Sequence, residues 1–278
     1  MTERPGHASE IVAELLARTD GKQLFIVSAG GDGTHGEVLS RLVDVPGTVD
    51  ATAIRLPMGT GNDGADAASM SEACGLLTFG VRHAGLPYVH VSDAAGRSWD
   101  AFNIVSLGLD AFVTDIGNRL KRLVPGDIYK SIADVATLFY EPAVGIGVTE
   151  AHLRLRDGTE EDVSGKFIIF AVGTSGNRSY GDGKRVLPGA ENLCAIETAG
   201  LRRKLALKSL LYDGRHTAEP EVLMRECTFV RLEYPGRVAM QLDGEAVWLD
   251  SDSFPLEMEL RHAPIGRITL EPAGHGKS

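Results

Sequence analysis

The residues best suited to chemistry gather first in a glycine-rich segment near the N-terminus. Residues 29–36 read "AGGDGTHG" and include Gly30, Gly31, Asp32, Gly33 and Thr34. Glycine lets a ligand approach bare backbone amides, and amides at the start of a helix attract phosphate. A carboxylate repels phosphate unless a cation intervenes, so Asp32 favours either nucleotide-borne Mg²⁺ or proton transfer. A simple strand-to-helix turn that uses aspartate for turn chemistry is the alternative.

A second segment of the same kind follows. Residues 57–64, "PMGTGNDG", contribute Gly59, Thr60, Asn62 and Asp63. No lysine lies in either segment, so neither matches the P-loop pattern GxxxxGK[ST]. Each follows a strand-like run and precedes a helix-like run. Both segments therefore fall at the carboxyl ends of strands, where ligands bind in open α/β sheets.

Asp243 and Glu245 form a third candidate, within "MQLDGEAV" (residues 240–247). A carboxylate could take the proton of an attacking alcohol. The Asp-Gly pair is also typical of a two-residue β-hairpin with a type I′ turn. The segment by itself leaves both interpretations open.

Helix-like and strand-like runs alternate through the first 87 residues and must position the two glycine-rich segments. Helical spacing of apolar residues predicts a helix at 8–18, and short apolar runs predict strands at 23–28 and 51–57. Thr34 and Glu37 form a capping-box pattern, which predicts that the next helix begins at His35. This alternation predicts an α/β N-terminal domain with a mostly parallel sheet.

The pattern changes after residue 87. Short period-two runs separated by turn residues predict a mostly β C-terminal domain over residues 88–261. We expect residues 1–87 to form the α/β nucleotide-binding domain, with residues 262–278 available to complete it. Helices are predicted at 115–140 and 200–214 within the β-rich part.

The helix predicted at 200–214 combines basic residues with leucines. Its basic residues are Arg202, Arg203, Lys204 and Lys208. This pattern is typical either of an ordinary surface helix packed on the core or of a helix lying on an anionic membrane.

Composition excludes several classes of function. The 278 residues include 28 basic and 38 acidic side chains, a net charge of −10 that argues against a general nucleic-acid binder. Three cysteines without a CxxC pair, and histidines without ligand spacing, predict neither a disulfide framework nor a zinc site. No run approaches the roughly 20 apolar residues of a membrane span, and the N-terminus lacks a secretory signal. We therefore expect a cytoplasmic protein.

Taken together, the motifs resemble the catalytic domain of diacylglycerol kinases and their bacterial lipid-kinase relatives. Sphingosine kinases and, more distantly, NAD kinases share this fold type. "GGDGT" is common to lipid kinases and NAD kinases, whereas "PMGTGND" favours the lipid branch. Three further segments agree in order, namely "TERPGHASEIVAEL" (2–15), "GNRSYGDGKRVLPGAE" (176–191) and "VAMQLDGEAVWL" (238–249). The resemblance spans nearly the whole chain.

The resemblance implies an ATP- and Mg²⁺-dependent lipid kinase of phospholipid metabolism that phosphorylates a diacylglycerol-like lipid. It assigns nucleotide binding to Gly30, Gly31, Asp32, Gly33, Thr34, Gly59, Thr60, Asn62 and Thr2. It assigns contacts to Mg-ATP to Asp32, Asp63 and Glu245, and the catalytic base to Asp243 with Glu245 as its neighbour. The implied partners are ATP, a lipid alcohol and, transiently, a membrane surface, while the oligomeric state is left open.

Two departures from the family pattern are visible. The family opens with a strand ending in an Asn-Pro-x-x-Gly loop, and this chain begins after that point, so we expect an exposed sheet edge. Residues 188–197, "PGAENLCAIE", lack the Asp-Asp-Gly segment that helps bacterial members hold a structural Mg²⁺, and that site is not expected. Two alternatives stay open: a kinase of another alcohol, such as a sphingoid base or NAD, and a catalytically silent nucleotide- or lipid-binding relative.

Overall fold

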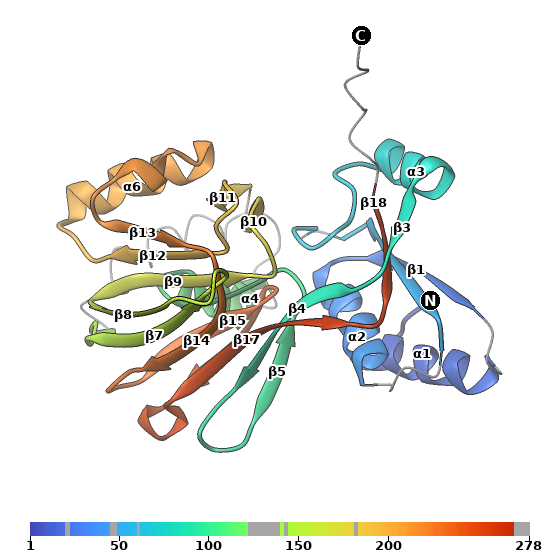
Figure 1. Ribbon diagram of the computed structural model, residues 1–278, viewed down its shortest axis with the longest axis horizontal. Coiled ribbons are helices and arrows are strands. Elements are labelled where there is room, and N and C mark those ends of the chain that lie inside the picture. The colour runs from blue at the N-terminus through green and yellow to red at the C-terminus, as the bar shows by residue number, and fades with distance from the viewer. Residues whose placement is uncertain are drawn as a thin grey trace, which may run out of the picture. The chain divides into compact units, whose positions relative to one another are not determined.

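The computed structural model describes residues 1–19, 23–44, 49–59, 62–121, 140–141, 144–180 and 183–269. The chain divides into two compact units (Figure 1). The first unit comprises Met1–Pro87 and His262–Ser278, and the second comprises Tyr88–Arg261. The first is an α/β unit and the second is β-rich, which confirms the predicted fold class.

The first unit contains, among its described residues, a four-stranded sheet in the order β1-β2-β18-β3. The strands are β1 (Leu24–Gly30), β2 (Ala51–Pro57), β18 (Gly266–Thr269) and β3 (Val81–His83). β1 and β18 both pair with β2 in parallel, and β3 is antiparallel to β18. The sheet is therefore mostly parallel, as predicted, and both glycine-rich segments follow the carboxyl ends of neighbouring strands.

Helices flank this sheet: α1 (His7–Arg18), α2 (Asp32–Val43) and α3 (Met70–Phe79). β2 is buried along nearly its whole length because Ile54 and Leu56 pack with Ala73 and Leu76 of α3. β1 lies at the edge of the described strands, and its Phe25 and Val27 side chains are 48% and 43% exposed. Two apolar side chains are therefore exposed on this last described strand of the sheet.

The predicted capping box at the start of α2 is wrong. α2 begins at Asp32 rather than His35, its N-cap is Gly31, and no side chain caps it. The Glu37 carboxylate instead accepts hydrogen bonds from the N–H groups of Gly6 (2.8 Å) and Ala8 (3.1 Å). Glu37 therefore satisfies free N–H groups at the start of α1, so a residue of one helix caps its neighbour.

The second unit contains two six-stranded sheets among its described residues. The first, in sheet order, consists of β5 (Ser98–Ala101), β4 (Leu86–Ser92), β17 (Leu256–Ala263), β14 (Cys227–Glu233), β7 (Thr149–Leu155) and β8 (Glu160–Gly165). The second consists of β13 (Val222–Arg225), β12 (Leu193–Glu197), β9 (Phe167–Gly173), β6 (Ile104–Gly108), β15 (Val238–Leu242) and β16 (Glu245–Leu249). A small pair, β10 (Arg178–Tyr180) and β11 (Lys184–Leu187), adjoins them.

The main core of this unit lies between its two sheets. Leu153 and Val230 of one sheet and Met240 of the other belong to a single buried cluster. A second cluster covers the outer face of the β6-containing sheet, where Leu207 and Leu211 of α6 (Leu201–Asp213) pack. Helix α4 (Leu109–Lys121) contacts the same sheet through β6, β15 and β16.

Two helix predictions fall in this unit. α6 lies within one residue of the predicted range at each end. α4 begins at Leu109, six residues before the predicted start at 115, and residues 122–139 of that prediction lie outside the described residues. In the part of the chain that the structure describes, no helix combines the length and apolar character needed to cross a membrane.

Candidate functional site

Asp32 joins the two glycine-rich segments of the first unit. Its carboxylate accepts hydrogen bonds from the N–H groups of Asp63 (3.3 Å) and Gly64 (2.9 Å), one at each oxygen. Asp32 is also the first residue of α2, where a negative charge is favourable. The Asp32 carboxylate therefore has a structural role, since it holds the second glycine-rich segment against the first.

The start of α2 presents backbone amides. In an α-helix the first N–H groups, here those of Asp32, Gly33 and Thr34, have no acceptor within the helix. Gly30 must lack a side chain because a Cβ atom there would lie 2.8 Å from Thr34 Cβ. Glycine at position 30 thus allows the Thr34 side chain to pack over the end of β1.

The second glycine-rich segment is braced from within. The Asn62 side chain accepts a hydrogen bond from Gly59 N–H and donates one to Gly59 C=O, both at 2.8 Å. The N–H of Met58 donates to Gly30 C=O (3.1 Å), which ties the segment to the end of β1. Asn62 therefore shapes the loop, whereas Thr60 lies outside the described residues.

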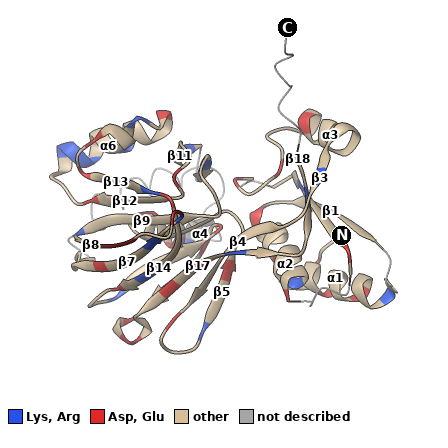
Figure 2. Cartoon of the chain, viewed as in Figure 1, with Lys and Arg blue, Asp and Glu red and all other residues tan. Residues whose placement is uncertain are grey.

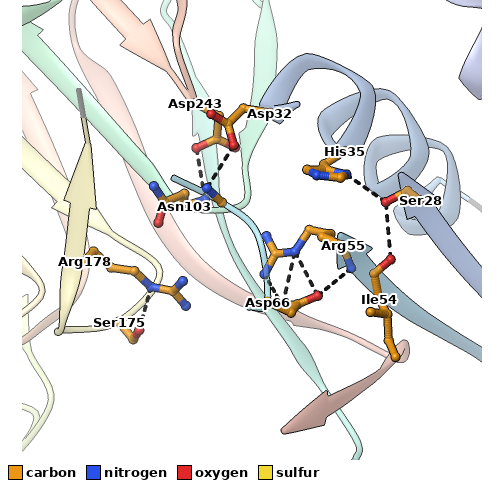
Figure 3. A network of polar contacts seen from close by, with 11 residues as sticks. Ser28, Asp32, His35, Ile54, Arg55, Asp66, Asn103, Ser175, Arg178 and Asp243 are labelled. Atoms are coloured by element: carbon orange, nitrogen blue, oxygen red, sulfur yellow. Dashed lines mark hydrogen bonds and ion pairs between the residues drawn. The ribbon is translucent and has the colours of Figure 1, made fainter. Parts of the chain in front are cut away.

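Two buried polar pairs support these segments (Figure 3). Arg55 of β2 forms an ion pair with Asp66, with Nη2 2.6 Å from Oδ1, and both side chains are largely buried. Ser28 Oγ lies 2.8 Å from His35 Nδ1 and 3.3 Å from the Ile54 carbonyl oxygen. The sequence pattern placed His35 at the start of a helix, and nothing in the local sequence pairs it with Ser28, seven residues earlier.

The environment of His35 disfavours the charged form of its ring. Burial, followed by the positive charge of Arg55, lowers the pKa of His35 below its usual 6.5. The Ser28 hydroxyl lies within hydrogen-bonding distance of both His35 Nδ1 and the Ile54 carbonyl oxygen, and His35 Nε2 is buried. The Leu56 backbone acts on the ring in the opposite sense to burial and favours its protonated form.

Asp243 of the second unit sits in a cradle of backbone amides (Figure 3). Its Oδ2 accepts from Phe102 N–H (2.6 Å), and its Oδ1 accepts from the N–H groups of Asn103 and Ile104 (both 2.9 Å). Asp243 and Gly244 have φ values of 50° and 92°, as a type I′ turn requires. The residue is therefore both a hairpin-turn residue and a firmly oriented carboxylate.

The remaining predicted residues are more exposed. Thr2 is exposed before α1, Glu245 is exposed at the start of β16, and Asp63 is partly exposed in the second segment. Across the described ranges, no three His, Cys, Asp or Glu side chains are gathered as a ready metal site. Mg²⁺ that arrives with a nucleotide needs only one or two protein carboxylates, and Asp32 and Asp63 belong to the right chemical class.

Two basic residues of α6 form ion pairs. Arg203 pairs with Glu219 and Glu221, and Lys204 pairs with Glu141. The side chains of Leu201, Leu205 and Tyr212 are instead exposed. Figure 2 shows basic residues along α6, so the helix presents apolar and cationic groups together.

Comparison with known proteins covers both units. Residues 1–80 match the model of the diacylglycerol kinase catalytic domain. Residues 103–260, more than half of the chain, match the YegS C-terminal NAD kinase beta sandwich-like domain.

Two curated relatives are similar along most of their length. A probable lipid kinase YegS-like from Xanthomonas campestris pv. campestris (strain 8004) is 29% identical over 259 residues, covering 88% of this chain and 79% of the relative. A protein of the same description from Pseudomonas fluorescens (strain Pf0-1) is 26% identical over 269 residues, covering 93% and 77%.

A solved structure shares the fold. A putative diacylglycerol kinase from Bacillus anthracis str. Sterne aligns with a TM-score of 0.64 at 18% identity, covering 98% of this chain and 86% of that one. At this identity the likeness supports the fold alone.

Proposed function

Because the chain belongs to the lipid kinase family that joins a diacylglycerol kinase catalytic domain to a YegS C-terminal NAD kinase beta sandwich-like domain, we propose that it transfers the γ-phosphoryl group of ATP to the hydroxyl of a diacylglycerol-like lipid. The observation that carries the proposal is the Asp32 contact, which holds two glycine-rich segments together beside the open amides of α2. Such a site suits a polyphosphate.

In this proposal the first unit binds the nucleotide. The amides of Gly31, Asp32, Gly33 and Thr34 bind phosphate oxygens, and the segment that contains Gly59 and Thr60 contacts phosphate or ribose. Mg²⁺ supplies charge neutralisation on the phosphates when bound. Asp32 and Asp63 of the first unit would hold it.

Asp243 takes the acceptor proton. As the lipid hydroxyl oxygen bonds to the γ-phosphorus, its proton passes to the Asp243 carboxylate, and the bond from the γ-phosphorus to the bridging oxygen breaks to release ADP. The amide cradle supports this role because three N–H groups orient the carboxylate before the acceptor arrives. Orientation of this kind contributes to catalysis by removing the need to order the group during reaction.

We propose that α6 contacts the membrane that contains the lipid acceptor. Leu201, Leu205 and Tyr212 share one helical stripe with Lys208, so a membrane can bury the apolar groups while the cations stay at the head groups. Replacing Leu201 and Leu205 by serine should weaken sedimentation with anionic phosphatidylglycerol vesicles. Leu77→Ser, at a similarly exposed leucine of α3, is the matched control. Equal sedimentation of both variants and the wild type would refute this assignment.

The function is tested by incubating purified protein with labelled ATP, Mg²⁺ and separate acceptors: diacylglycerol, a sphingoid base, other lipid alcohols and NAD. We expect labelled product with diacylglycerol-like lipids, and no product with Asp243→Asn although that variant still binds ATP. If labelled product formed only with a sphingoid base or NAD, the protein would be a kinase of that alcohol and not of diacylglycerol. ATP binding without transfer to any acceptor would favour a silent relative.

A further inference from the structure

Gly244, the residue that follows Asp243, is held at both its N–H and its C=O. Gly244 N–H donates to Gln241 Oε1, and Gly244 C=O accepts from Asn118 Nδ2, each at 2.9 Å. Gln241 belongs to β15 and Asn118 to α4. Two side chains from different elements therefore clamp the turn that carries the Asp243 carboxylate.

Gln241 is itself fixed by a buried partner. It pairs across the strands with Ser106 of β6, and the two side chains are only 3% and 0% exposed. Gln241 Nε2 donates to Ser106 Oγ at 2.9 Å. The Ser106 hydroxyl donates in turn to Oδ2 of Asp110 in the first turn of α4.

Helix α4 is anchored to the same hairpin. Trp248 Nε1 of β16 donates to Asp115 Oδ2 at 3.0 Å, and the rings of Phe112 and Trp248 meet edge to face. Asp110 and Asn118 are therefore presented to the β15–β16 hairpin by a helix that the hairpin itself holds in place.

The chain of hydrogen bonds has a fixed direction. An ionised Asp110 can only accept, so the single Ser106 proton goes to Asp110. Ser106 Oγ must then accept from the Gln241 amide NH₂. That leaves the Gln241 carbonyl oxygen facing Gly244 N–H, which is the orientation the turn needs.

We propose that Gln241, oriented through Ser106 by Asp110, is a positioning residue that holds the Asp243–Gly244 turn for phosphoryl transfer. The kinetic part of this inference rests on the function proposed above. Gln241 does not touch the reacting atoms. It acts through the turn, so its loss lowers kcat and leaves the KM for ATP unchanged.

The direction of the chain gives a reversal test. Gln241→Glu puts carboxylates on both sides of the Ser106 hydroxyl, whose one proton cannot satisfy both. In Asp110→Asn/Gln241→Glu, the new amide at position 110 donates to Ser106 Oγ, and the hydroxyl donates to the new carboxylate at position 241, which still accepts from Gly244 N–H. We expect kcat to fall about 10- to 100-fold in Gln241→Glu and in Gln241→Met, and to recover to within a few-fold of wild type in the double variant.

A matched control separates positioning from stability. Ser253 is equally buried, and its Oγ accepts a hydrogen bond from Arg97 Nη2 at 2.9 Å, at the opposite end of β5 from the residues that bind Asp243. Ser253→Ala should lower the melting temperature but leave the kcat of the folded protein unchanged. A double variant no more active than Gln241→Glu, or a loss that appears only in KM, would overturn the inference.

Amide exchange at Gly244, followed by NMR in the full-length protein, tests the clamp without any activity. We expect slow exchange in the wild type, faster exchange in Gln241→Met and slow exchange again in the double variant. A wild type that transfers no phosphate to any acceptor refutes the proposed function and the kinetic part. Exchange at Gly244 that is fast in the wild type, or unchanged by Gln241→Met, overturns the clamp itself.

Discussion

Replacing Asp243 by asparagine exchanges a carboxylate oxygen for an NH₂ group, although both oxygens accept backbone N–H donors. The better orientation keeps an oxygen towards Asn103 and Ile104 and turns Nδ2 towards Phe102 N–H, so two donors face each other. A hydrogen bond to a charged group contributes about 1.5–3 kcal/mol, and an unpaired buried N–H costs about 1–3 kcal/mol. We therefore expect the free energy of unfolding of the second unit to fall by about 3 kcal/mol.

The loss should be visible in a thermal scan. A domain of this size class changes its melting temperature by about 2–4 °C per kcal/mol, so the midpoint should fall by about 6–12 °C. The chain has two tryptophans, Trp99 and Trp248, and both lie in the second unit, so their fluorescence reports its unfolding. Glu245→Gln, at an exposed residue two positions on, is the control and should melt like the wild type.

An Asp243→Asn midpoint equal to the wild-type value would refute the view that the three amides bind a carboxylate. If the midpoint falls as expected, kcat must be measured on the folded fraction. Only then does the lost turnover of this variant bear on the proton-accepting role of Asp243.

Three further perturbations follow from contacts in the first unit. Asp32→Asn places an NH₂ donor opposite the N–H of Asp63 or Gly64, where the wild type has an acceptor. The second glycine-rich segment is then less well preorganised, so the ATP affinity measured by calorimetry should fall about tenfold. An unchanged ATP affinity would contradict the role of these two hydrogen bonds. Glu37→Gln removes the charged acceptor of the Gly6 and Ala8 N–H groups at the start of α1, so the free energy of unfolding from circular-dichroism melts should fall by about 1–2 kcal/mol. Glu14→Gln, at an exposed residue, is the control and should change it little. The native pKa of His35 is lowered from 6.5, chiefly by burial, so native protein binds this proton more weakly than unfolded protein does. Its contribution to stability is complete above about pH 6.5 and is lost as pH falls towards the native pKa, so urea titrations of His35→Leu should show a flatter pH dependence than those of the wild type; an equal slope would contradict it.

Much of the fold was predictable because local apolar patterns carry it. The alternation of helix and strand up to residue 87 and the many short strands after it follow from periodicity that neighbouring residues reveal. β3 and β18 were missed because they have three and four residues, too few for a pattern. The start of α2 was misjudged because Glu37 bonds to Gly6 and Ala8, 31 and 29 residues away, instead of capping its own helix.

The candidate site was predictable in its residue types but less so in its contacts. The glycine-rich segments and the Asp-Gly pair stand out by composition alone. The amides that hold Asp243 come from residues 139 to 141 positions away, and no local rule pairs them. Gln241 and Ser106 read as ordinary strand residues, since only the register of β15 on β6 brings them face to face.

The order of the strands in the first unit also has a consequence for biosynthesis. Thr52 of β2 pairs with Gly266 of β18, so β2 cannot gain this partner strand until more than 200 further residues have been synthesised. The second unit lies between these two strands in the chain, and its β4 and β17, which end the intervening segment on either side, lie next to each other in one sheet. Once they pair, the long loop between β2 and β18 becomes effectively short, which lowers the entropy cost of completing the first sheet. We expect a refolding chain to form its β-sandwich before the four-stranded sheet of the first unit, and a mutation that slows formation of the sandwich to delay both.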